Sequence, residues 1–367
     1  NNQMEALNRV IRDMDKDEDT DHCLRVVSSS LILNEAHLTS EERERLLHWR
    51  TAHRLGLKSK KDKHGLNENC VICDEGKRKV SGYKRNFEFM GVNSGPLRPY
   101  WRMYCDGYGG QGSMGIESYE GAKGGFVFAC PTGSVKQRLY GSTKQFPAIL
   151  YQVLQEVETA GYVCREIYVD TFSVNLSKAA EEVAAMFRVR IIPISAGTPQ
   201  ELAYAESAVR VVGQMSRTLM AGATHLPKSC WGLADLYAVY LHDLLGQKKL
   251  MGRSPFEFRN GREPDFDVFF VHVFGCPCQY APMSGPDHKR APKTEWGYFV
   301  GVQWPMVLVL RIEDEKILSV SRHKVHCHEE AYARYDPTSG KDPLATFGLP
   351  KINLETTRTA QENLETI

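Results

Sequence analysis

Residues 165–220 are REIYVDTFSVNLSKAAEEVAAMFRVRIIPISAGTPQELAYAESAVRVVGQMSRTLM, in which strand-like and helix-like segments alternate. REIYVD and VRIIPI are short β-prone runs, whereas SKAAEEVAAMF and TPQELAYAESAVRVVGQMSRTLM carry helical patterns. Upstream, residues 98–108 and 124–133 predict two strands joined by a glycine-rich turn, and residues 146–161 predict a helix. The apolar face of that helix consists of Ile149, Leu150, Val153, Leu154 and Val157. This alternation predicts an α/β core, a mixed sheet flanked by helices.

The composition on either side of this core divides the 367-residue chain into further segments. We expect an acidic linker or upstream tail over 1–35, a small helical module with a basic stretch over 36–92, the α/β core over 93–247, a small β-rich domain over 248–335 and a polar tail over 336–367. In the small module, Thr39 or Ser40 followed by Glu41 and Glu42 predicts a helix start. The β-rich domain is expected from the runs VFFVHVF, WGYFVGVQ, MVLVLRI and ILSVSRHKVH.

Charge and apolar patterning exclude several classes of protein. The chain has 46 Lys plus Arg against 45 Asp plus Glu, so the positive charge that a polyanion requires must be local. No apolar run approaches the roughly 18 residues of a membrane span, and the first residues lack the pattern of a signal peptide. We therefore expect a protein that is neither secreted nor in a membrane, in which the ten cysteines are thiols or metal ligands.

Two histidines and two cysteines have the spacing of a structural zinc site. His48 and His53 lie five residues apart, and Cys70 and Cys73 form a CxxC pair sixteen residues further on. Two imidazoles and two thiolates supply the four ligands of a closed tetrahedral zinc site. His37 and His64 are competing imidazoles, and a redox CxxC pair is disfavoured because no thioredoxin-like βαβ unit surrounds it.

A basic stretch between residues 57 and 86 has nine Lys or Arg against four Asp or Glu. It is either a solvated loop or a surface that contacts nucleic acid phosphates. The predicted DNA contacts are Lys58, Lys60, Lys61, Lys77, Arg78, Lys79, Lys84, Arg85 and Arg210.

Three carboxylates are candidates for divalent metal chemistry. Asp106 and Asp170 each end a predicted strand, and Glu206 follows Asp170 after thirty-five residues. On a helical wheel Glu206 lies near Leu202 and Val209, which predicts a carboxylate on the apolar face of its helix. Glu201 has a simpler explanation, because Thr198 and Glu201 form a capping box with Pro199. Three converging carboxylates would hold divalent cations, and two Mg²⁺ ions would activate a water or 3′-hydroxyl for phosphoryl transfer.

A second metal site in the C-terminal part is a weaker alternative. Its possible ligands are Cys276, Cys278, His323, His326, Cys327 and His328. The CPC spacing is short for a zinc knuckle, and buried cysteines or alternating histidines on a strand account for these residues equally well.

The segments that carry a family resemblance are, in order, LHWRTAHRLG, CVICDEGKRK, YCDGYGG, IYVDTFSVN and GTPQELAYAESAVR. Through them the chain resembles the integrase region of copia-type LTR retrotransposons and, more broadly, retroviral-type integrases with a D,D-35-E triad. The resemblance covers roughly residues 45–330, including GRSPFEFRNGREPDFDVFFVHVFGCPCQYAP and SVSRHKVHCHEE. It implies an RNase H-like catalytic core with Asp106, Asp170 and Glu206 as its triad, and a zinc-binding N-terminal domain with His48, His53, Cys70 and Cys73 as ligands.

Some positions depart from the family pattern. Relatives usually have Asn-Gly after the second aspartate and again before the glutamate, where this sequence has Thr171-Phe172 and Leu202-Ala203. The basic residue usual after the glutamate is here Ser207. An intact triad favours an active enzyme, and the alternative is a degenerate or domesticated copy that binds DNA without catalysis. An RNase H-type nuclease acting alone on RNA–DNA hybrids is a third interpretation, disfavoured because it has no need of a zinc module.

The expected function is therefore 3′-end processing and strand transfer of retrotransposon DNA ends into target DNA. The expected cofactors are structural Zn²⁺ and catalytic Mg²⁺ or Mn²⁺. The expected partners are double-stranded DNA, both transposon ends and target, and further copies of the chain in a homo-multimer. The expected location is the nucleus, with a stage in a cytoplasmic particle.

Overall fold

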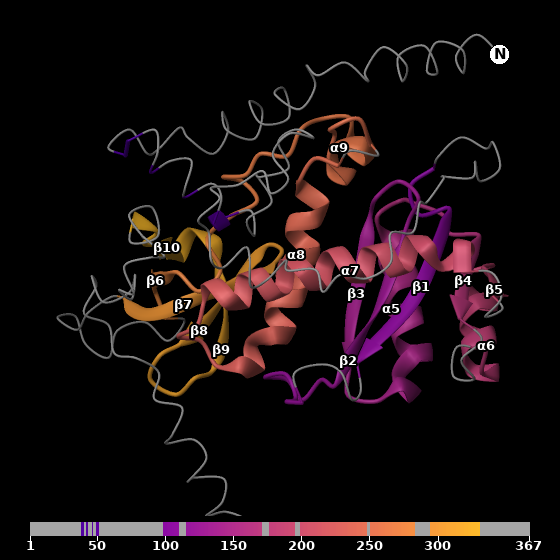
Figure 1. The fold of residues 1–367 in the computed structure, drawn as a ribbon, viewed down its shortest axis with the longest axis horizontal. Coiled ribbons are helices and arrows are strands. Elements are labelled where there is room, and N and C mark those ends of the chain that lie inside the picture. Colours follow the sequence, from indigo (N-terminus) through magenta and orange to yellow (C-terminus); the bar gives the residue numbers. More distant parts are fainter. Residues whose placement is uncertain are drawn as a thin grey trace, which may run out of the picture.

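The structure is a computed structural model. It describes residues 38, 39, 42, 46, 49, 50, 98–109, 115–170, 176–194, 199–247, 250–282 and 294–330, with only the backbone at 199–203. Two five-stranded sheets lie at opposite ends of this region, and the helices α7 (Pro199–Gly222) and α8 (Trp231–Leu244) lie between them (Figure 1). None of the described helices is long and apolar enough to cross a bilayer.

The first sheet has the strand order β3-β2-β1-β4-β5. Its strands are β1 (Arg102–Gly109), β2 (Gly124–Ala129), β3 (Val135–Tyr140), β4 (Glu166–Asp170) and β5 (Arg190–Ile194). The pairs β1–β2 and β2–β3 are antiparallel, whereas β1–β4 and β4–β5 are parallel. The predicted mixed sheet flanked by helices is confirmed, and β3 is a strand that sequence patterning did not predict.

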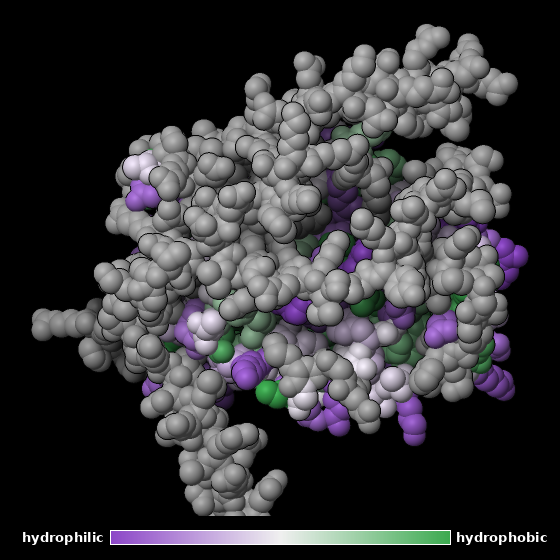
Figure 2. Space-filling view, viewed as in Figure 1, coloured by the Kyte–Doolittle hydropathy of each residue, from purple (hydrophilic) through white to green (hydrophobic). Residues whose placement is uncertain are grey.

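Helices cover both faces of this sheet. Successive side chains of a strand point to opposite faces, so each face presents apolar residues to a helix layer. α5 (Phe146–Thr159) and α6 (Lys178–Met186) pack with Met103 and Cys105 of β1 on one face, and α7 packs on the other. All five apolar positions predicted for the helix at 146–161 are buried. Ser177 caps α6 by accepting a hydrogen bond from the backbone N–H of Ala180. Hydrophilic side chains gather along the margin where β4, β5 and α6 lie (Figure 2).

The second sheet is antiparallel throughout, with the order β10-β6-β7-β8-β9. Its strands are β6 (Pro277–Tyr280), β7 (Glu295–Gln303), β8 (Met306–Arg311), β9 (Ile317–Ser321) and β10 (Val325–Cys327). The strand-like runs beginning at residues 296, 306 and 317 are therefore confirmed as strands. A short helix, α9 (Pro255–Asn260), precedes this sheet.

The apolar run at 268–274, predicted as a strand, is instead a series of turns. The Asp265 side chain accepts hydrogen bonds from the backbone N–H groups of Asp267 and Val268, which starts the turn, and Phe270 has a positive φ of 52°. The prediction of a strand was wrong because these apolar residues are buried without pairing to another strand. Val271, Val273 and Phe274 belong to turns whose side chains fill the core.

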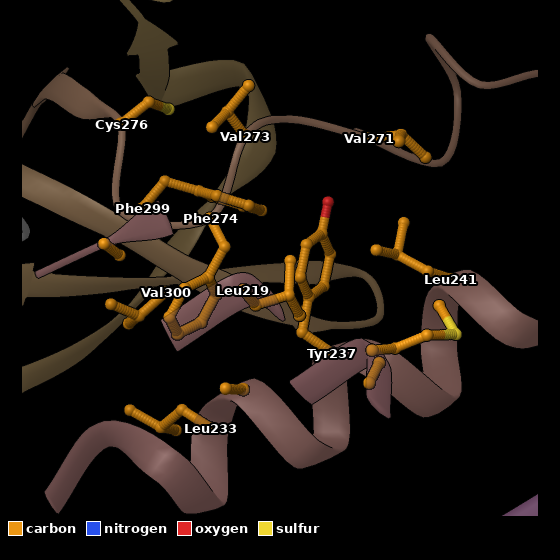
Figure 3. Close-up of a cluster of buried hydrophobic side chains, with 14 of the residues drawn as sticks. Leu219, Leu233, Tyr237, Leu241, Val271, Val273, Phe274, Cys276, Phe299 and Val300 are labelled. Carbon is orange, nitrogen blue, oxygen red and sulfur yellow. The ribbon is translucent and has the colours of Figure 1, made fainter. Parts of the chain in front are cut away.

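One apolar core runs from α7 and α8 into the second sheet. Tyr237 reaches from α8 toward Val271, Phe274 and Phe299 (Figure 3), and its ring centroid lies 5.2 Å from that of Phe299. The Tyr237 hydroxyl donates to the His272 carbonyl oxygen (2.7 Å) and accepts from the His272 N–H (3.1 Å). The predicted domain boundary at 247/248 stays a prediction, and apolar packing is continuous across it.

Leu38, Leu46 and Trp49, near the N-terminus, belong to the same core. Residues 42, 46, 49 and 50 are helical, and Thr39 with Glu42 forms a reciprocal capping box of 3.2 and 2.8 Å. Thr39 and Ser40 were the two predicted N-caps, and the capping hydrogen bonds that the structure describes are made by Thr39. Trp49 is buried against α7, where a Cβ added at Gly222 would lie 2.6 Å from its ring.

A buried ion pair fastens this N-terminal helix to the end of the second sheet. Arg50 Nε donates to both carboxylate oxygens of Glu329, at 3.1 and 3.0 Å. The same carboxylate accepts the backbone N–H of Val273 at 2.6 Å and lies 2.8 Å from Nδ1 of His272. Glu329 is only 5% exposed, and these partners hold the pKa of its carboxyl well below the usual range despite burial.

Candidate active site

The parallel pairing of β1 with β4 places two aspartates side by side. Cys105 pairs with Val169, so the next residues along the two strands, Asp106 and Asp170, lie at matching positions. Tyr104 and Asp106 alternate with the α5-facing residues of β1, which directs Asp106 toward the sheet face that α7 covers. The expected convergence of strand ends is therefore present for these two carboxylates.

Glu206 lies on α7, which packs across β1 and β4. The buried residues of this helix include Ala205, Ala208 and Val212, whereas Glu206 is exposed. The prediction that Glu206 lies on the apolar face was wrong, because the buried stripe is centred near Ala205 and Ala208, and Glu206 projects from its edge. An exposed carboxylate at that edge is free of the desolvation cost expected for the apolar face.

The charge environment of Asp106 relates the three carboxylates to one another. Partial burial is the largest cause that raises the pKa of Asp106, to about 6, and the negative charges of Glu206 and Asp170 raise it further. The backbone N–H of Gly107 opposes this rise by hydrogen bonding to the carboxylate. Asp106 therefore sits in a negative environment that a bound cation would relieve.

The carboxylates do not form a closed metal site. Among the residues that the structure describes, no three His, Cys, Asp or Glu side chains lie close enough together to hold a metal ion. The donors fit Mg²⁺ or Mn²⁺ by type, since both prefer carboxylate oxygens. Glu206 is exposed, and its charge acts on Asp106 from α7.

The remaining predicted site residues have different outcomes. Arg210 is exposed on α7, one turn after Glu206 and on the same side of the helix. Glu201 is in the first turn of α7, and its side chain lies outside the described residues, as does Thr198, so the capping box stays a prediction.

The predicted zinc ligands and the basic stretch also lie outside the described residues. The zinc ligands in question are His48, His53, Cys70 and Cys73. The DNA contacts in question are Lys58, Lys60, Lys61, Lys77, Arg78, Lys79, Lys84 and Arg85. These assignments stay predictions.

The cysteines and histidines near the C-terminus do not support the alternative second metal site. Cys278 faces Cys327 across the β6–β10 pair, and Cys276 and Cys278 are fully buried. Burial is the main cause that raises the pKa of Cys276 to about 11, as is typical of a thiol in an apolar core. Within the described ranges, these side chains form no metal-binding group.

The sequence reasoning missed three tyrosines beside the carboxylates. Tyr104 is buried, and its ring stacks on those of Tyr168 and Tyr204, with centroid distances of 4.9 and 5.0 Å. The signal was present as Tyr-Cys-Asp at 104–106, Tyr-Val-Asp at 168–170 and Tyr-Ala-Glu at 204–206. Each candidate carboxylate has a tyrosine two residues before it.

Comparisons with known proteins relate part of the chain to retrovirus-related elements. No family model matches. The Pol polyprotein of transposon RE1 from Arabidopsis thaliana is 30% identical over 128 residues, which is 34% of this chain and 8% of that polyprotein. The Pol polyprotein of transposon RE2 from the same plant is 32% identical over 104 residues, 28% of this chain and 7% of that polyprotein. The chain therefore spans less than a tenth of the length of these relatives.

Two solved structures are also similar. One is a simian T-cell lymphotropic virus intasome in complex with PP2A regulatory subunit B56 gamma, with 11% identity, a TM-score of 0.38, and coverage of 71% of this chain and 87% of that chain. The other is the HTLV-2 integrase catalytic core domain in complex with magnesium in a trimeric form, with 14% identity, a TM-score of 0.35, and coverage of 45% of this chain and 99% of that chain.

Proposed function

We propose that this chain is a polynucleotidyl transferase of the retroviral integrase type, with Asp106, Asp170 and Glu206 as its catalytic carboxylates. The observation that carries the proposal is the placement of Asp106 and Asp170 at matching positions of two parallel strands, with Glu206 of α7 close enough for its charge to act on Asp106. The sequence relation to retrovirus-related Pol polyproteins supports the same function. We further propose that the source is a copia-type retrotransposon.

In this proposal each carboxylate has a defined task. Asp106 and Asp170 approach the reacting phosphate from the rigid sheet, and the exposed Glu206 closes the site by turning toward them. Two divalent cations, Mg²⁺ or Mn²⁺, would when bound supply an activated water or 3′-hydroxyl and stabilise the leaving oxygen. Asp106 must be ionised to act as a ligand, so its raised pKa predicts that protons compete with the cation for this site and that acid weakens metal binding.

The substrate in this proposal is double-stranded DNA, first a transposon end and then the target. Arg210 on the exposed side of α7 would contact phosphates near the carboxylates. The basic stretch would add contacts, so replacing Lys77, Arg78 and Lys79 by Ala should flatten the log–log salt dependence of DNA affinity by up to about three units. An unchanged slope would assign those residues to a solvated loop.

Further parts of the proposal follow from the resemblance. One zinc ion held by His48, His53, Cys70 and Cys73 would stabilise the N-terminal domain. Several copies of the chain would act together on paired DNA ends. The protein would act in the nucleus after a stage in a cytoplasmic particle.

The competing function is a catalytically silent DNA-binding protein with the same fold. It is favoured by the residues that depart from the family pattern, Thr171-Phe172 after the second aspartate and Ser207 after the glutamate. The two functions share DNA binding and differ only in metal-dependent chemistry.

A strand-transfer assay separates them. Labelled duplex ends are incubated with a target duplex in Mg²⁺ and in Mn²⁺, using the wild type, Glu206→Gln and the matched variant Glu201→Gln on the same helix. We expect joined products with the wild type and Glu201→Gln and none with Glu206→Gln. A wild type that binds DNA but joins no ends would establish the silent alternative, and an active Glu206→Gln would overturn the triad.

A further inference from the structure

We propose that the stacked tyrosines Tyr104, Tyr168 and Tyr204 are positioning residues that set the relative placement of the three carboxylates and therefore the affinity of the site for divalent cations. This inference rests on the proposed function and extends it to residues outside the triad. It follows from the stacking geometry and from the spacing of each tyrosine to its carboxylate.

The three rings form one continuous stack, in which two rings come from the sheet and one comes from α7. Tyr104 of β1 is the central ring, with interplanar angles of 21° to Tyr168 of β4 and 27° to Tyr204 of α7. Tyr104 is only 3% exposed, so a ring at this place serves packing and has no free face for a ligand. Together the three rings join the three elements that carry Asp106, Asp170 and Glu206.

An ion-pair network anchors the β4 end of the stack. The guanidinium carbon of Arg102 lies 5.4 Å from the Tyr168 ring centroid, in cation–π range. Arg102 Nε donates to Glu166 Oε2 at 2.8 Å, and Arg190 of β5 pairs with the other oxygen of that carboxylate. The Tyr168 hydroxyl also lies 3.4 Å from Glu166 Oε2. These ion pairs tie β1, β4 and β5 together four residues before Asp106 and Asp170, with the tyrosine pair in between.

On the strands, the stack and the acidic pair occupy successive positions of one face. Tyr104 pairs directly with Tyr168, and residues two apart on a strand are separated by about 6.6 Å and point to the same side. The contact between the two rings therefore reinforces, one position along the same face, the strand register that places Asp106 beside Asp170.

On the helix, the link between tyrosine and carboxylate is different. Tyr204 and Glu206 are about 200° apart around α7, and the buried Ala205 and Ala208 lie between them. The two side chains therefore project from opposite edges of the buried stripe. Val212, Met215 and Leu219 hold the later turns of α7 in the core, whereas at the turn that carries Glu206 the buried residues are the small Ala205 and Ala208. Stacking of Tyr204 on Tyr104 adds the one aromatic contact between this turn and β1 that the structure describes, and in our proposal it sets the direction in which Glu206 projects.

The test compares Tyr204→Ala and Tyr204→Phe in the full 367-residue chain, with Tyr151→Ala as a matched control. Tyr151 is an aromatic residue on α5, 41% exposed, that makes an edge contact with Phe187 on the opposite side of the sheet. The first readout is binding of Mn²⁺ alone, measured by the paramagnetic signal of the free ion. The second readout is strand transfer as a function of Mn²⁺ concentration, with circular dichroism as the check of folding.

We expect Tyr204→Ala to weaken Mn²⁺ binding about tenfold and to regain strand transfer at high Mn²⁺, because only the placement of Glu206 is lost. Tyr204→Phe, which keeps the ring, and Tyr151→Ala should match the wild type. A folded Tyr204→Ala with wild-type Mn²⁺ affinity would overturn the inference and leave the proposed function intact, as would a Tyr204→Phe as weak as Tyr204→Ala. If Tyr204→Ala weakens Mn²⁺ binding but the wild type joins no ends, the inference stands and the proposed function fails.

Discussion

Replacing Asp106 by Asn should stabilise the metal-free protein at neutral pH and have little effect in acid. Burial and the neighbouring carboxylates raise the pKa of Asp106 from 3.8 to about 6 in the folded chain. Well below pH 3.8 both folded and unfolded chains carry a protonated Asp106, so its contribution to stability is neutral there and small at pH 4. Between pH 4 and 6 the folded chain binds more protons than the unfolded chain, so stability falls as pH rises, and above pH 6 the full penalty is present.

The magnitude follows from the size of the shift. Two pKa units correspond to about 3 kcal/mol, and because Asp106 is only partly buried, solvent screening reduces the expected effect to about 1–2 kcal/mol. In a domain of this size that free energy raises the thermal midpoint by about 2–8 °C. Asn is nearly isosteric, and its carbonyl oxygen can still accept the N–H of Gly107.

Thermal unfolding in EDTA at pH 4 and pH 8 measures this effect. Asp267→Asn, at an exposed position in the turns before β6, is the control for removal of one negative charge. Asp106→Asn should gain stability over the wild type at pH 8 but not at pH 4, whereas Asp267→Asn should change little at either pH. A gain of the same size at both pH values, or no gain at pH 8, would refute the electrostatic account of Asp106. Addition of Mn²⁺ should reverse the order at pH 8, since only the wild type keeps all its ligands.

Three other predictions concern stability and metal content. Glu329→Gln should lower the free energy of unfolding by about 3–5 kcal/mol at pH 7, since Arg50 stays buried without its partner. Urea denaturation should show this loss shrinking below about pH 4, because there the unfolded chain binds a proton at Glu329, whereas the folded chain with its depressed pKa does not. Gly222→Ala should cost about 1–3 kcal/mol because its Cβ meets the Trp49 ring, whereas Gly213→Ala on the same helix faces only a flexible side chain and should stabilise by about 0.5–1 kcal/mol. Equal thermal midpoints for the two variants would contradict this account of helix packing. Elemental analysis should find one zinc per chain in the wild type and less in Cys70→Ser; equal zinc in both would remove Cys70 from the ligand set.

The amphipathic helices were predicted well from the sequence, because each buries one face and the apolar residues of that face recur with the helical period. α5 buries the five positions that its apolar face indicated, and α6 begins after the Ser177 cap. By contrast, α8 buries residues all round, including Asp235, so it has no polar face from which a helical period could be recognised. Strand β3 was missed because Lys136, Gln137 and Arg138 lie within it.

Other features could not be predicted because they depend on contacts between residues far apart in the sequence. Gln137 is buried because its side chain amide pairs with the Tyr108 hydroxyl, which in turn binds Asp235 at 2.5 Å. Nothing near residue 137 in the sequence indicates those partners. The meeting of Asp106 with Asp170 was predictable because parallel strands end at a common edge. The exposure of Glu206 was not, because it depends on the roll of α7 over the sheet.

The bond between Arg50 and Glu329 has a consequence for the order in which the chain folds. The two residues are 279 positions apart, so joining them in an unfolded chain would cost about 5 kcal/mol of loop-closure entropy at 25 °C. The carboxylate also needs the backbone N–H of Val273 and the ring of His272, which are in place only after the turns before β6 have formed. The contact is therefore late in folding, and its loss should speed unfolding while leaving the folding rate nearly unchanged. In kinetic terms it acts as a latch that closes after assembly and sets how long the assembled fold survives.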